Sequence, residues 1–149
     1  MPTTTAAYAT LRGRWRTQME EGGPKIPTQY DNIPFGDDFD GTATPKQQPD
    51  DAEWARLTLL RGTRAQITAG AIGTRTYREE GLLVAQLFAP KDKGTKNLED
   101  VEDTIIRTAF VPQVLSSVRI GTPESTLVGE QGGLWQLNVS IPYEFDYVA

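Results

Sequence analysis

The chain has 149 residues, a length that suits one domain with a single buried core. Hydrophobic residues make up 38% of it and charged residues 23%, which is the composition of a globular protein rather than a disordered one. The net charge of −5 argues against a nucleic-acid-binding protein, because such proteins normally present a basic surface.

The chain contains no cysteine and no histidine. Disulfides, thiolate nucleophiles and cysteine metal sites are therefore excluded. Without histidine, the chain also lacks the commonest general base, the commonest zinc ligand and any Ser-His dyad. A hydrolase would need carboxylates with a metal ion, or a Ser-Lys pair. We therefore expect a protein that is not an enzyme and that binds no cofactor.

No apolar run approaches the roughly 20 residues that a membrane-spanning helix needs. The first residues, Met-Pro-Thr-Thr-Thr-Ala-Ala, lack the basic and apolar regions of a signal peptide. We therefore expect a soluble protein that is made in the cytoplasm and has no membrane partner.

The N-terminal part predicts a helix over residues 3–20 and then a short extended segment over residues 26–33. Apolar residues recur in the helix at three- and four-residue steps, which is the helical period. They are Tyr8, Leu11, Trp15 and Met19. A threonine among residues 3–5 can cap the start, and Gly22-Gly23-Pro24 ends the helix.

Residues 36–52 form a long polar loop. Its aspartates are Asp37, Asp38, Asp40, Asp50 and Asp51. Carboxylates of this kind can bind Mg²⁺ or Ca²⁺. The run that begins at Asp37 is not the calcium-binding loop pattern, however, because no glutamate follows at the required distance. A solvated loop or an interface loop is therefore favoured over a metal site.

Three strands are expected in the middle of the chain, over residues 54–60, 65–77 and 82–89. Alternate residues of the first are apolar, and Gly70 and Gly73 make the second irregular. Glu79-Glu80-Gly81 predicts the turn before the third, which ends at Pro90. We expect these strands to form an antiparallel meander.

A second helix is expected over residues 97–111, with Asn97 as its cap. Its apolar face comprises Leu98, Val101, Ile105 and Ala109. Pro112 ends it.

The C-terminal part predicts two paired strands. Residues 118–120 and 126–128 are expected to belong to one strand that pairs across the Gly132-Gly133 turn with the last strand. The last strand alternates inward apolar residues with outward polar residues. The inward residues are Trp135, Leu137, Val139 and Ile141. The strand continues past Pro142, which implies a sheet edge or a bulge there.

These elements predict a single α+β domain over residues 1–149. We expect an antiparallel or mixed β-sheet of about five or six strands, with two α-helices packed on one face.

Besides the five aspartates of the long loop, two further sets of residues are candidate interface residues. The first set lies near the ends of the first hairpin: Arg61, Arg64, Arg75 and Arg78. These arginines are ordinary strand-end charges, partners for the acidic loop of a neighbouring copy, or DNA contacts. The second set alternates on the last strand: Tyr143, Phe145 and Tyr147. An exposed aromatic set there would mark an interface.

Several short motifs occur in one order along nearly the whole chain. They are Gln29-Tyr30-Asp31-Asn32, Pro34-Phe35, Trp54-Ala55-Arg56-Leu57, Arg78 and Gly81 before residues 83–90, Lys93-Gly94-Thr95, Gly133-Leu134-Trp135, and Ile141-Pro142-Tyr143-Glu144-Phe145-Asp146. In order and spacing, the chain resembles the tail terminator-like family of long-tailed bacteriophages (siphophage tail completion proteins) and related prophages.

The resemblance implies a structural virion protein at the head-tail junction that is assembled in the host cytoplasm. Its subunits would form a ring, most often a hexamer, that binds the last ring of tail tube protein and stops polymerisation. The other face of the ring would receive the head completion or stopper protein. Genome DNA would pass through the lumen without specific binding, which an acidic wall allows.

Two other functions remain open from the sequence. One is another neck or tail component, such as an adaptor, a stopper or a tail tube subunit. The other is a carboxylate-metal phosphodiesterase built on the acidic loop. A monomeric binding module whose long loop captures a partner is a weaker third reading.

Overall fold

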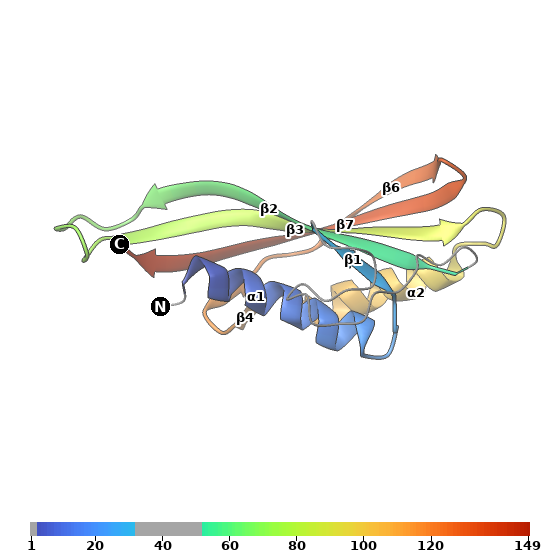
Figure 1. The fold of residues 1–149 in the computed structure, drawn as a ribbon, viewed down its shortest axis with the longest axis horizontal. Helices are drawn as coiled ribbons and strands as arrows, with labels where there is room; N and C mark the ends of the chain where they lie inside the picture. Colours follow the sequence, from blue (N-terminus) through green and yellow to red (C-terminus); the bar gives the residue numbers. More distant parts are fainter. Residues whose placement is uncertain (1–2, 32–51) are drawn as a thin grey trace.

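The computed structural model describes residues 3–31 and 52–149. They form a single α+β domain with two helices and a mixed, mostly antiparallel sheet of seven strands. Figure 1 shows both helices on the same face of the sheet. The predicted fold class is therefore confirmed, and the sheet has more strands than expected because short edge strands are added to the long ones.

Both helices begin as α-helices and end in a wider π-helical turn. Helix α1 covers Thr4–Trp15 and continues as the π turn Arg16–Glu20, while α2 covers Lys96–Thr104 and continues as Ile105–Ala109. Thr3 caps α1, since its hydroxyl oxygen accepts a hydrogen bond from the Ala6 amide at 3.1 Å. None of the described helices has the length and apolarity that crossing a membrane would need.

The predicted cap of the second helix is wrong by two residues. Thr95 is the N-cap of α2, and its hydroxyl donates to the Glu99 carboxylate at 2.8 Å. Asn97 lies inside the first turn, where its side-chain amide donates to Glu53 at 3.1 Å. Asn97 thus links α2 to Glu53, the residue before the strand that begins at Trp54, instead of capping the helix.

The apolar stripes of the two helices pack against the sheet and make the core, as the periodicity predicted. The buried helix residues are Tyr8, Leu11, Trp15, Met19, Leu98, Val101, Ile105 and Ala109. The helices also contact each other, since Arg14 donates from Nε to the Ala109 carbonyl at 2.9 Å.

Three of the seven strands are long, and the other four are shorter. In chain order, the strands are β1 (Thr28–Tyr30), β2 (Trp54–Gln66), β3 (Thr76–Pro90), β4 (Gln113–Leu115), β5 (Val118–Ile120), β6 (Glu124–Gln131) and β7 (Leu134–Val148). The order is β1-β2-β3-β7-β5-β4, with β6 also on β7. Only β1 and β2 are parallel; the other pairs are antiparallel.

The predicted meander over residues 54–89 is wrong. Strands β2 and β3 form one long hairpin, and β3 then pairs with β7. Residues 67–75, which were assigned to a strand, form the hairpin loop because Gly70 and Gly73 adopt positive φ angles of 153° and 91°. Glu79-Glu80-Gly81, the predicted turn, lies inside β3.

Residues 118–120 and 126–128 belong to two strands rather than one. Both β5 and β6 lie along the same edge of β7, and only β6 pairs across the Gly132-Gly133 turn. Pro142 lies at the break between them, where its carbonyl accepts a hydrogen bond from the Gly121 amide at 2.8 Å. In an antiparallel strand, the N–H and the carbonyl of one residue point to the same side. Proline has no N–H, and at position 142 the missing donor would have pointed toward this break.

We expect Gly81→Ala to destabilise the domain by roughly 1–3 kcal/mol, because an added Cβ would overlap the Leu60 carbonyl oxygen and the Tyr143 hydroxyl. Gly13→Ala in α1 is the matched control. A Cβ there meets nothing within 4 Å, so this variant should be stabilised by about 0.5–1 kcal/mol. Urea unfolding of both variants measures the difference. Equal stability of the two would contradict the close approach at Gly81.

Candidate assembly surface

A long exposed part of the sheet is the far half of the β2–β3 hairpin, residues 60–78, which we call the arm. Figure 1 shows it extending past the first turn of α1 at one end of the molecule. Residues 60–74 are all exposed. The arm contains four arginines and no acidic residue. It includes all four arginines that the sequence marked as interface candidates.

A buried carboxylate holds the base of the arm to α1. The Glu79 side chain is fully buried and accepts two hydrogen bonds, from the Tyr8 hydroxyl at 2.6 Å and from Arg64 Nε at 2.7 Å. Burial, together with the bond to Glu79, raises the pKa of the Tyr8 hydroxyl. The bond to Glu79 also raises the pKa of the Arg64 guanidinium. Arg61 lies over the Tyr8 ring, 5.0 Å from its centre.

Strand register brings these side chains together. Glu79 pairs with Arg64 on β2 and with Phe145 on β7, so all three share the sheet face that the helices cover. A bulge between Arg61 and Arg64 shifts the register of β2 before Arg64 meets Glu79.

Glu79 was not among the candidate residues predicted from the sequence, because a run of two glutamates and a glycine resembles a turn. The signal that identifies it is the alternation around it. Tyr77, Glu79, Gly81 and Leu83 all fall on the face that the helices cover, and that alternation continues into the buried part of β3.

A second charged cluster lies on the opposite face of the sheet. Arg78 binds Asp146 through two hydrogen bonds, from Nε at 2.8 Å and from Nη2 at 3.0 Å. Arg119 binds Glu144 at 2.6 Å and Asp146 at 3.1 Å. The bonds from Arg78 and Arg119 lower the pKa of Asp146. This cluster joins β3, β7 and β5 across the uncovered face.

The four candidate arginines therefore differ in their surroundings. Arg64 and Arg78 bind carboxylates of their own chain. In the described part of the chain, Arg61 and Arg75 form no ion pair, and Arg75 donates to the Gly70 carbonyl at 2.7 Å. An intersubunit role stays a prediction, and Arg61 and Arg75 are the better placed for it.

The predicted exposed aromatic set on the last strand is wrong. Tyr143 is 2% exposed and Phe145 is fully buried, because both point toward α1. Tyr8 packs edge-on against each of them, with ring centres 6.5 and 6.1 Å away. Tyr147 is partly buried and stacks on Tyr77, with ring centres 5.6 Å apart.

The candidate acidic residues of the long loop, Asp37, Asp38, Asp40, Asp50 and Asp51, lie outside the described residues. Within residues 3–31 and 52–149, no group of three or more acidic side chains is arranged to hold a metal ion. The described candidate surface therefore consists of the arm, which the buried Glu79 anchors to α1, and the charged cluster on the uncovered face.

Comparison with known proteins identifies the fold and not a family. No family model and no curated protein matches the chain. A solved structure whose printed name says nothing of its function matches with a TM-score of 0.64 and 13% sequence identity, over 98% of this chain and 98% of the other. At this identity, the likeness establishes the α+β fold over the full length and no more.

We expect Glu79→Gln to destabilise the domain by roughly 1.5–3 kcal/mol, the usual range for hydrogen bonds to a charged group. The amide cannot accept from both Tyr8 and Arg64 as a carboxylate does. Glu80→Gln, next to it on the exposed face of β3, is the matched control and should change stability by less than about 0.5 kcal/mol. Urea unfolding compares the two, and similar losses would mean that Glu79 does not anchor the arm.

Acid should weaken the charged cluster on the uncovered face of the sheet by protonating Asp146. Because the folded state lowers the pKa of Asp146 below its ordinary value of 3.8, the unfolded chain binds the proton more tightly. The contribution of Asp146 is therefore fully present above pH 3.8 and is lost as the pH falls toward the folded-state pKa.

Asp146→Asn removes this titration, so we expect lower stability at neutral pH and a shallower loss of stability in acid. Urea unfolding of both proteins at a series of pH values measures the two slopes. Parallel curves for wild type and variant would contradict the role of Asp146.

Proposed function

We propose that the chain is a structural subunit of a long-tailed phage, a ring-forming tail terminator that caps the tail tube. The observation that carries the proposal is the exposed arm, together with the motif order along the chain. The arm presents apolar side chains to solvent, and Ile72 is 87% exposed. Exposed apolar side chains on a projecting hairpin favour a subunit that is completed by a neighbour over a protein that acts alone.

In this proposal, copies of the chain form a closed ring, a hexamer in the family that the chain resembles. The ring occupies the end of the tube once the tail has reached its length, so no further tube protein can add. Its other face receives the head completion or stopper protein. The net negative charge suits a lumen through which genome DNA slides without sticking.

The nearest alternative is another neck or tail component: an adaptor, a stopper or a tail tube subunit. The carboxylate-metal phosphodiesterase depends on aspartates outside the described residues, and no observation in the described part of the chain favours it.

Electron microscopy of the purified protein mixed with tail tubes grown without it tests the proposal. We expect rings at tube ends and no growth beyond them when free tube protein is added. Continuous tubes made of this chain would identify a tube subunit instead. Tube ends that stay bare and continue to grow would contradict the terminator function.

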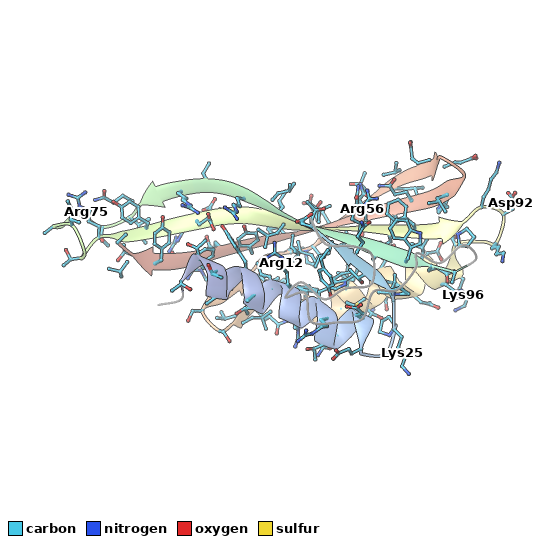
Figure 2. All side chains as sticks on the ribbon, viewed as in Figure 1. Arg12, Lys25, Arg56, Arg75, Asp92 and Lys96 are labelled. Atoms are coloured by element: carbon cyan, nitrogen blue, oxygen red, sulfur yellow. The ribbon has the colours of Figure 1, made fainter. Side chains whose placement is uncertain are left out.

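We expect Arg75→Glu to weaken self-association roughly tenfold, because an anion replaces an arm cation that has no ion pair among the described residues. Lys25→Glu is the matched control. It makes the same change of charge away from the arm, as Figure 2 shows, and should leave association unchanged. Sedimentation velocity over a concentration series measures both. Arg78 is avoided here, since reversing it would also break the bonds to Asp146. Equal association of the two variants would remove Arg75 from the interface.

A further inference from the structure

An apolar groove with an acidic rim lies between α2 and the β6–β7 hairpin. Its volume is about 480 Å³. Its walls include Leu98, Leu127, Trp135 and Leu137, and its rim includes Glu99 and Glu102. Leu127 is 62% exposed although it lies on the face of β6 that points toward the helix layer. Figure 1 shows why, since the β6–β7 hairpin turns away from α2 at this end of the sheet.

The arm carries side chains that match this groove. Ile67 and Ile72 are exposed on the hairpin loop. Arg75 follows them without an ion pair in the described part of the chain. On the other side, Glu99 and Glu102 form no ion pair within that part, and the hydroxyl of Thr95 donates to Glu99. An apolar tip with one cation is therefore complementary in chemistry to an apolar groove with two carboxylates.

The arm cannot reach the groove of its own chain. Figure 2 places Arg75 at one end of the long axis and Lys96, the first residue of α2, near the other. A contact between the two surfaces must therefore join different copies.

We propose that the arm of one copy docks in the α2–β6 groove of the next copy. Ile72 enters the groove beside Leu127 and Trp135, and Arg75 lies against the carboxylates of Glu99 and Glu102. The volume lies within the range of about 300–1,000 Å³ found for pockets that take small ligands, so it holds a few side chains and not a whole strand. The inference rests on the proposed function and identifies the subunit contact of the ring.

The two surfaces differ, so the contact is heterologous. Each copy uses its arm on one neighbour and its groove on the other, and such contacts either close into a ring or continue as a filament. The apolar insertion supplies the burial, while the Arg75–carboxylate contact sets orientation more than affinity.

Cysteine cross-linking tests the contact directly, because the chain has no cysteine of its own. A tagged Ile72→Cys protein is mixed with an untagged Leu127→Cys protein and oxidised. A disulfide requires Cα atoms within about 7 Å, so only docked pairs can be joined. The control pairs Ile72→Cys with Val114→Cys, an exposed position on edge strand β4. We expect the Ile72–Leu127 pair to form at least ten times faster than the control pair.

A mixing experiment tests the direction of assembly. Ile72→Asp blocks the arm, and Leu127→Asp blocks the groove. Both positions are exposed, so urea unfolding should match wild type. We expect neither variant to associate alone, while the mixture forms one-to-one pairs in sedimentation, because one intact arm meets one intact groove.

Equal cross-linking rates for the two cysteine pairs, or a mixture that stays monomeric, would overturn the contact. If wild-type rings cap the tubes but the two cysteine variants form no Ile72–Leu127 disulfide, the terminator function stands and only this interface is rejected. If the disulfide forms but the wild-type protein does not cap tubes, the interface stands and the terminator function is rejected.

Discussion

Fifteen consecutive residue pairs join β3 to β7, from Thr76 with Val148 to Pro90 with Leu134. Strands β2, β5 and β6 pair directly with this ladder, while β1 and β4 join the sheet through β2 and β5. At about 3.4 Å per residue, the ladder is about 50 Å long. A helix rises only about 1.5 Å per residue, so α1 together with its π turn, residues 4–20, spans about 25 Å. The helices therefore cover only part of one sheet face. The end of the sheet that they leave uncovered becomes the arm.

A ribbon that extends beyond its core needs other support, and charged side chains supply it on both faces. On the helix face, the buried Glu79 carboxylate binds Tyr8 of α1 and Arg64 of β2. On the other face, Arg78 and Asp146 join β3 to β7. A stiff arm of this kind presents its tip to a neighbour in one orientation, which lowers the ordering cost of association. The same polar groups that complete the fold thus prepare the surface that we propose for assembly.

The sequence predicted the parts of the fold that follow from local periodicity. Burial confirms the stripes of α1 and α2, and it confirms the alternation of the last strand from Leu137 to Ile141. At the start of that strand, Trp135 is only partly buried and Gln136, predicted to face out, is buried. It failed where a distant partner decides the conformation. Glu79 is tolerated inside β3 only because Tyr8 and Arg64 bind it, and Pro142 is tolerated in a central strand only because β5 ends and β6 begins beside it. Phe145 was expected at an interface, but α1 covers it. The candidate arginines were located correctly on the hairpin, yet the sequence could not separate Arg78, which is paired, from Arg75.

The proposed function is tested most directly in the phage that encodes the chain. Particles assembled without it are compared by electron microscopy with particles complemented by the wild-type chain. We expect tails that grow beyond their normal length and stay detached from filled heads, with normal virions restored by complementation. Tails of normal length joined to heads in the absence of the chain would contradict the terminator function.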